Sequence, residues 1–184
     1  MKSQVSILAF DLGKTMGWAR CSCSVRPELK MTVVDQGTIY FDQLATEYMR
    51  KNYNEIYSRP RVRMILFEDI VRKLTSQVKY DAFVVEDIFL NPKRVSAFRS
   101  LMIYMETLER IVNTEKMMRL HTVPTRVCKQ HISGFGGSDK SEVQDAVLTH
   151  PNIVVKKPNE MSEHESDAVA VAWAMANSYL NSLT

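Results

Sequence analysis

The stretch ILAFDLGKTMGWAR, residues 7–20, decides how the rest of the chain is interpreted. It begins with an apolar run, ends that run on a single carboxylate, Asp11, and continues through two glycines. An apolar run of this kind predicts a short strand buried on both faces, over residues 4–10. The glycines predict a turn, after which residues 18–21 form a second strand. Asp11 then has three interpretations: a structural cap, part of a phosphate-binding loop, or a metal ligand.

Length and composition predict one globular domain. The chain has 184 residues, within the usual range of a single domain. Its 45% hydrophobic and 24% charged residues exclude a disordered chain. The net charge of +3 and the pI near 8.7 allow a polyanionic partner without requiring one. Because the apolar run before Asp11 is shorter than a signal-peptide core or a membrane span, we expect a cytoplasmic protein without membrane association.

The cysteines predict neither a metal site nor a disulfide framework. There are three, Cys21, Cys23 and Cys128, and an odd number argues against a fully paired set. The spacing of the first two does not suit a zinc site. We therefore expect reduced thiols, as in intracellular proteins.

Strands and helices alternate along the rest of the sequence. In chain order, we expect a strand over 31–41, a partly helical stretch over 42–58, a helix over 65–78, a strand over 80–90, a helix over 92–118, a strand within 119–127, and helices over 126–132, 138–149 and 162–180. Short loops join the first three strands, which predicts an antiparallel meander, and β-α-β units that follow predict parallel neighbours. The predicted fold class is α/β, with a mixed five-stranded sheet and helices on both faces.

Three acidic residues have positions that suit a shared site. Asp11 ends the first strand, Glu86 lies at the end of the strand over 80–90, and Asp167 follows His164 by one helical turn. Residues three apart share a helix face, and parallel neighbouring strands would place Asp11 beside Glu86. Buried carboxylates resist joint ionisation, and a divalent cation such as Mg²⁺ or Mn²⁺ removes that penalty. The pattern therefore indicates a metal site.

Each of these residues also has a structural interpretation. Acids at strand ends often cap turns, and a lone histidine is often a surface residue. The neighbouring acids Asp87, Glu163 and Glu165 are expected to be solvated or to favour the helix dipole. Glu163 or Glu165 would replace His164 as a ligand if the helix register were shifted by one residue.

A longer motif, over residues 128–147, indicates which kind of protein carries these acids. Residues 128–147, CKQHISGFGGSDKSEVQDAV, together with FDLGKTMGWA, VVEDIF and HESDAVAVAWA, resemble the RuvC family of Holliday-junction resolvases, which have an RNase H-like nuclease fold. The pattern Lys-Gln-x-x-x-Gly-x-Gly-x-x-x-Lys-Ser-x-Val-Gln, from Lys129 to Gln144, is long and specific to that family. The resemblance implies a single domain over residues 1–184 with an insertion at about 42–60, and its departures suggest a viral (bacteriophage) member, which would act in the host cytoplasm.

The resemblance implies a metal-dependent endonuclease that resolves Holliday junctions or other branched DNA by hydrolysing phosphodiester bonds near the branch point. It implies Mg²⁺ or Mn²⁺, as two ions, and a homodimer. The implied metal ligands are Asp11, Glu86, His164 and Asp167; Lys129 and Lys140 would lie near the scissile phosphate, and Phe89 would stack on junction bases unless it packs in the core. Lys93 and Arg94 are further candidates for phosphate contacts.

Two departures from the family pattern affect these expectations. His164 stands where many members have a carboxylate, which lowers the charge of the site and favours a different metal preference. Leu101 and Met105 stand where bacterial members have glycines, which changes the approach of a partner helix.

Two other functions compete with the nuclease. An actin-like ATPase has a similar phosphate loop, but 184 residues cannot hold the two domains that it needs. A non-cleaving protein that binds branched DNA remains an alternative, against which the intact set of acids argues.

Overall fold

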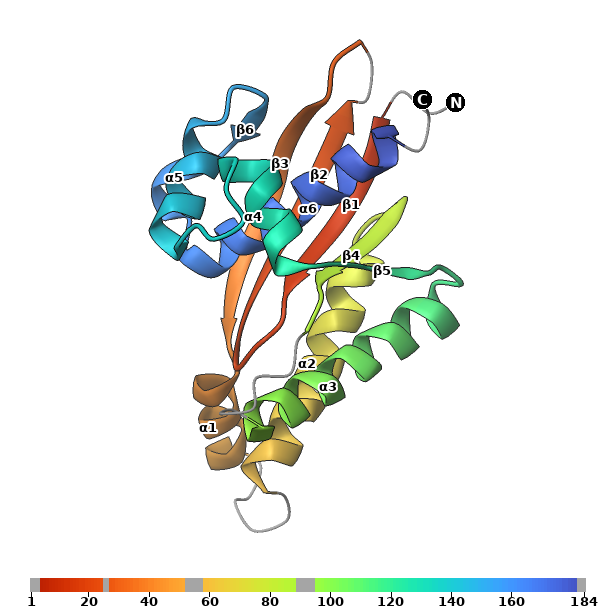
Figure 1. The fold of residues 1–184 in the computed structure, drawn as a ribbon. Coiled ribbons are helices and arrows are strands. Elements are labelled where there is room, and N and C mark those ends of the chain that lie inside the picture. Colours follow the sequence, from red (N-terminus) through yellow and green to blue (C-terminus); the bar gives the residue numbers. More distant parts are fainter. Residues whose placement is uncertain (1–3, 25–26, 52–57, 89–94, 182–184) are drawn as a thin grey trace.

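A six-stranded sheet forms the centre of the chain in the computed structural model, which describes residues 4–24, 27–51, 58–88 and 95–181 (Figure 1). The strands are β1 (Gln4–Asp11), β2 (Thr15–Ser24), β3 (Lys30–Tyr40), β4 (Ala82–Glu86), β5 (Leu120–Val123) and β6 (Ile153–Val155). Their order across the sheet is β5-β4-β1-β2-β3-β6. Strand β2 is antiparallel to its neighbours β1 and β3. The other pairs are parallel: β4 with β1, β5 with β4, and β6 with β3. The predicted mixed sheet is confirmed.

The prediction of five strands was wrong by one. The sixth, β6, has three residues and pairs with Met31–Val33 of β3. Three residues are too few to give an alternating pattern, so only the tertiary pairing identifies the strand. It forms because Ile153 is buried beside Met31 at the edge of the sheet.

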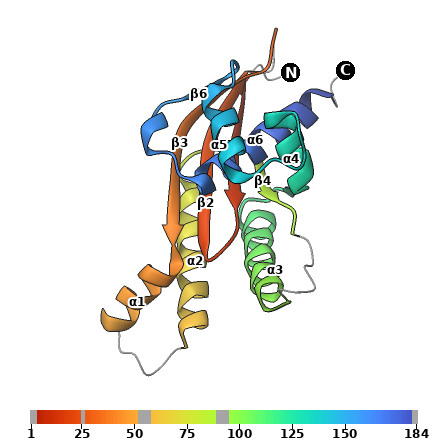
Figure 2. The same ribbon diagram turned by 60° about the vertical axis from the view of Figure 1, so that its left-hand side comes forward.

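Helices cover both faces of the sheet (Figures 1 and 2). They are α1 (Phe41–Lys51), α2 (Arg59–Ser76), α3 (Val95–Arg110), α4 (Thr125–Ser133), α5 (Lys140–Thr149) and α6 (Glu163–Asn181), with a π-helical turn at Ile111–Glu115 and a 3₁₀ turn at Pro158–Glu160. Pro60 lies in the first turn of α2, where its fixed φ suits a helix start, so α2 begins earlier than the predicted residue 65. Among the residues described, no helix is long and apolar enough to span a membrane.

Alternation along β1 divides the core into two layers. Ile7 and Ala9 pack with α4, α5 and α6, whereas Leu8 and Phe10 pack with α1, α2 and α3 on the opposite face. Ala45 of α1 is fully buried, so the predicted insertion at 42–60 contributes to the fold, although residues 52–57 lie outside the described residues.

The three cysteines belong to this core. Cys21, Cys23 and Cys128 are buried and free of disulfide bonds, as expected for reduced thiols. Burial raises the pKa of Cys23 and of Cys128 to about 12, so both thiols stay protonated at neutral pH.

Helix α6 packs closely on the middle of the sheet, and Gly17 makes this possible. A Cβ atom at Gly17 would lie 1.9 Å from the backbone oxygen of His164 in the first turn of α6. Gly17 was predicted to form a turn, but it lies within β2, opposite Asp11 of β1 and Thr38 of β3. Its function is therefore to let the helix approach the strand, and the turn itself contains Gly13.

We predict that Gly17→Ala destabilises the fold by roughly 1–3 kcal/mol, since either β2 or the start of α6 has to move. Urea denaturation followed by circular dichroism measures the change in the free energy of unfolding. A midpoint and slope equal to those of the wild type would contradict the close packing of α6 on β2.

Candidate metal centre

An acidic hollow of about 320 Å³ opens where β1 and β4 end. These two strands are parallel, with Phe10 opposite Val85, so the next residues, Asp11 and Glu86, come out at the same edge of the sheet. The hollow is lined by Asp11, Leu12, Gly13, Lys14, Thr15, Glu86, Thr125, Lys129, Lys140, His164 and Asp167. All four predicted ligands and both predicted lysines therefore lie around one space.

His164 is bound directly to Asp11. The imidazole Nδ1 lies 2.8 Å from Asp11 Oδ2, and both side chains are mostly shielded from solvent, with exposures of 30% and 14%. This hydrogen bond raises the pKa of His164, which favours the charged imidazolium. In the protonated form His164 is a counter-ion of Asp11 within the hollow.

The other two carboxyl groups are held in an unfavourable electrostatic environment. Burial raises the pKa of Glu86 to about 7, and the charges of Asp11 and Asp167 add to this, although a hydrogen bond from Thr125 acts in the opposite direction. Burial also raises the pKa of Asp167 to about 6, again with a contribution from Asp11. A bound cation would therefore favour the ionised forms of Glu86 and Asp167.

The donor set fits a hard divalent cation. Carboxylate oxygens are the ligands that Mg²⁺ and Mn²⁺ prefer, and an imidazole is a ligand that Mn²⁺ also accepts. Within the described part of the chain, however, no three His, Cys, Asp or Glu side chains are already grouped so that they could hold one ion. The imidazole of His164 is bonded to Asp11 instead.

Glu165 does not line the hollow; the expectation that it is solvated was wrong, whereas the alternative expectation of a charge at the helix N-terminus agrees with its place in the first turn of α6. Its side chain is buried and accepts hydrogen bonds from Thr38 Oγ1 at 2.8 Å, from the Ser162 backbone N–H at 3.1 Å and from Gln36 Nε2 at 3.3 Å. The Glu165 N–H donates to Ser162 Oγ at 3.2 Å, which completes a capping box at the start of α6. The sequence Ser-x-x-Glu at 162–165 carried this signal. The neighbouring Glu163 is exposed and lies near Lys140.

The two lysines contribute positive charge from neighbouring helices. Lys140, the first residue of α5, has its Nζ 3.6 Å from Glu163 Oε2 and 3.9 Å from Asp167 Oδ2. Lys129 on α4 donates a hydrogen bond to the backbone carbonyl of Ser138. Both charges act to lower the pKa of Asp167. Each lysine is therefore close enough to influence the acids and remains at the rim of the hollow.

Three predicted DNA-binding residues cannot be placed. Phe89, Lys93 and Arg94 lie outside the described residues, so their roles stay predictions. Thr125, which lines the hollow and donates to Glu86, was missed by the sequence analysis because a single threonine carries no recognisable pattern.

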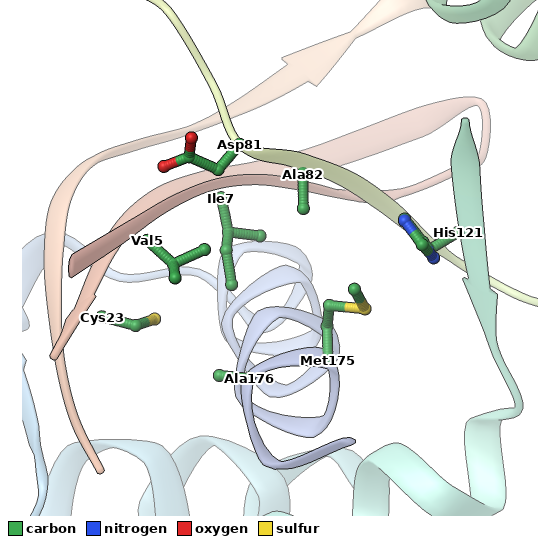
Figure 3. A pocket seen from close by; sticks show the side chains of 8 residues that line it. All are labelled: Val5, Ile7, Cys23, Asp81, Ala82, His121, Met175 and Ala176. Atoms are coloured by element: carbon green, nitrogen blue, oxygen red, sulfur yellow. The ribbon is translucent and has the colours of Figure 1, made fainter. Parts of the chain in front are cut away.

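A second cavity, of about 100 Å³, lies at the opposite ends of β1 and β4 (Figure 3). Ile7, Met175 and His121 are among the residues that line it, and Asp81 also lines it, although its carboxylate points away from Ile7 and Met175 in Figure 3. Asp81 accepts a hydrogen bond from the Ser6 backbone N–H at 3.0 Å. With one carboxylate, already bonded, this cavity does not resemble the acidic hollow.

Comparisons with known proteins agree with the fold. The family model described as "Crossover junction endodeoxyribonuclease RuvC" matches residues 27–175. The RuvC proteins of Vibrio atlanticus (strain LGP32) and Aliivibrio fischeri (strain MJ11) are 29% and 27% identical over 107 residues. Each match spans 58% of this chain and 58% of the relative's length.

Solved structures are similar over nearly the whole chain. Thermus thermophilus RuvC has a TM-score of 0.69 at 14% identity and covers 96% of both chains. The same protein in complex with a Holliday junction substrate has a TM-score of 0.67 at 14% identity, over 95% of this chain and 96% of that one. The yeast mitochondrial Holliday junction resolvase Ydc2 has a TM-score of 0.64 at 14% identity, over 96% and 80%. The predicted RuvC-like, RNase H-like fold is confirmed.

We predict that Glu86→Gln stabilises the metal-free protein at pH 8 by roughly 1–3 kcal/mol. The folded pKa of about 7 is above the ordinary value of 4.5, so the penalty is absent well below pH 4.5, grows between pH 4.5 and about 7, and is fully present at pH 8. Thermal unfolding in EDTA at pH 8 and pH 5 should show an advantage of the variant that is large at pH 8 and small at pH 5.

The exposed Glu106→Gln on α3 is the control for loss of one negative charge.

Millimolar Mn²⁺ should raise the melting temperature of the wild type more than that of Glu86→Gln. Equal shifts in both proteins would mean that Glu86 does not contact the ion.

Proposed function

The chain belongs to the RuvC family, and we propose on that basis that it is a divalent-metal-dependent endonuclease that resolves Holliday junctions or other branched DNA. One observation carries this proposal: Asp11, Glu86 and Asp167 line the same hollow, although they are up to 156 positions apart in the sequence. Three half-buried acids line this hollow together with three lysines, and this grouping has no evident packing purpose. They suit a site that binds cations and phosphate together.

The proposed division of labour follows from the chemistry of each group. Asp11, Glu86 and Asp167 would hold the metal, proposed as two Mg²⁺ or Mn²⁺ ions, and His164 would join them as a ligand once the metal displaces its proton and its hydrogen bond to Asp11. Such ions supply positive charge at the attacking and leaving oxygens during phosphodiester hydrolysis. Relative to a fourth carboxylate, His164 gives the site one negative charge less and one nitrogen ligand, which would shift its metal preference.

The lysines act on the DNA. Lys140 lies beside Asp167, and Lys129 lies between the hollow and the following loop, so both reach the rim where a phosphate would approach. Their charges attract the backbone and offset the negative charge that develops on the scissile phosphate. We also propose that Phe89, Lys93 and Arg94 contact DNA near the branch point.

The substrate class is proposed from the family. The Thermus thermophilus RuvC structure holds a Holliday junction substrate, and its fold matches this chain closely. We propose the same class of branched DNA here, bound by a homodimer. Met105 of α3 is buried in the core of this chain. A partner helix would therefore contact other residues of α3.

We predict that Asp11→Asn and Asp167→Asn bind a synthetic four-way junction nearly as well as the wild type but cut it on the order of 100-fold more slowly or worse. Each variant keeps the shape of the side chain and loses the charge that holds a cation. Gel-shift affinity and single-turnover cleavage in Mg²⁺ and in Mn²⁺, on junction, fork, flap and plain duplex, provide the measurements.

Asp69→Asn, an exposed position on α2, is the matched control and should cut at the wild-type rate. Near-wild-type cutting by either hollow variant would refute the ligand assignment. Junction binding by a wild-type protein that cuts none of the four DNAs would favour the non-cleaving alternative.

A further inference from the structure

The loop between α4 and α5 holds an aromatic ring in solvent. Phe135 is 68% exposed, and it lies in the segment Gly134–Gly137 that follows α4. Helices α4 and α5 pack against each other on the α6 side of the sheet (Figures 1 and 2). A single exposed apolar residue is ordinary on a protein surface. Phe135 differs from an ordinary exposed residue because hydrogen bonds hold its backbone and because it lies near the acidic hollow.

The backbone beneath the ring is firmly held. Ser138 is only 4% exposed and donates to the carbonyl of Phe135 from its N–H, at 3.3 Å, and from its hydroxyl, at 2.9 Å. Ser133 Oγ lies 2.8 Å from Ser138 Oγ and 3.3 Å from the same carbonyl. Lys129 donates to the carbonyl of Ser138. The ring is therefore presented from a preorganised loop, which reduces the entropy lost on binding a partner.

Because Gly136 and Gly137 have no side chains, other side chains pack directly against their backbone beside the ring. A Cβ atom at Gly137 would lie 2.7 Å from Cε1 of Phe135, and one at Gly136 would lie 2.4 Å from Cγ of Arg126. The aromatic ring thus lies against Gly137, and the aliphatic part of Arg126 lies against Gly136. A flat apolar surface and a guanidinium group are presented next to each other.

Three hollows that share lining residues form a groove from this ring to the acidic hollow. The hollow beside the ring, of about 260 Å³, is lined by Arg126, Gln130, Gly134, Phe135, Gly136 and Gly137. The next, of about 370 Å³, is lined by Asp87, Ile88, Pro124, Thr125, Arg126, Lys129 and Gly136. It shares Arg126 and Gly136 with the first, and Thr125 and Lys129 with the acidic hollow. The path therefore runs from the carboxylates past Lys129 and Arg126 to Phe135.

We propose that Phe135 stacks on a nucleotide base of a DNA strand that lies in this groove, with Arg126 beside the strand's phosphates. The proposal rests on the proposed nuclease function, because the groove begins at the site of hydrolysis. An aromatic ring stacks only on a base whose face is free, and such bases occur at a branch point or in single strands. The contact therefore favours branched DNA over intact duplex.

Charge and shape both favour a nucleic acid in the groove. Arg126 and Lys129 line it along its length, with Asp87 as the acidic residue of the middle hollow. Basic side chains that follow the backbone and an aromatic residue that receives a base are the usual elements of single-strand binding. The family resemblance implied an aromatic contact at Phe89, and Phe135 is proposed as a second one.

The test compares Phe135→Ala and Phe135→Trp, each combined with Asp11→Asn so that the DNA stays intact. Val154→Ala is the matched control, because Val154 is 59% exposed on β6, which pairs with the opposite end of β3 from the acidic hollow. A four-way junction with 2-aminopurine at positions next to the branch point reports stacking by its fluorescence. Titration of this junction and of a plain duplex gives the two dissociation constants.

We expect Phe135→Ala to bind the junction roughly 5- to 100-fold more weakly and to lose the 2-aminopurine response. Duplex binding should change less than twofold, and both Phe135→Trp and Val154→Ala should behave as the parent. Parent-like binding and fluorescence in Phe135→Ala, or an equal loss on junction and duplex, would overturn the stacking proposal. Cleavage of the same junction by the protein with Asp11 intact tests the nuclease function separately.

Discussion

The candidate site depends on the packing of the first turn of α6 against β2. Gly17 leaves room for the backbone of His164, and the capping box of Ser162 and Glu165 fixes the start of the helix at that point. Thr38 on β3 anchors the Glu165 carboxylate from the sheet. With its first turn held in this way, α6 presents His164 and Asp167 to the acidic hollow. Any shift of the helix along the sheet would move both residues away from Asp11.

The carboxylates that suit the proposed metal site also lower the stability of the metal-free fold. Burial and mutual repulsion raise the pKa of both Glu86 and Asp167, so the ionised site opposes folding at neutral pH. The His164–Asp11 pair and the charge of Lys140 relieve part of this repulsion. The proposed cations would relieve the rest. The two core layers around the sheet supply the stability that lets the chain retain such a site.

The sequence predicted those parts of the structure that depend on local patterns or on long motifs. The apolar run before Asp11 and the β-branched run at 31–41 identified strands, and the motif from Lys129 to Gln144 identified the family. Gly17 was misinterpreted because a glycine that ends a strand and one that admits a helix look alike in sequence. The place of Glu165 in the first turn of α6 followed from the sequence, but its burial did not, because its partners Thr38 and Gln36 are distant along the chain. The three-residue β6 was missed because its pairing with β3 is purely tertiary.

The hollow at the ends of β1 and β4 is proposed to hold divalent cations. Crystals grown or soaked in MnCl₂ and measured near the manganese absorption edge would locate such ions directly by their anomalous scattering. We predict strong anomalous peaks in contact with Asp11, Glu86 and Asp167, and their loss in Asp167→Asn crystals. An empty hollow in wild-type crystals, under Mn²⁺ concentrations at which the same protein cuts junctions, would contradict the claim.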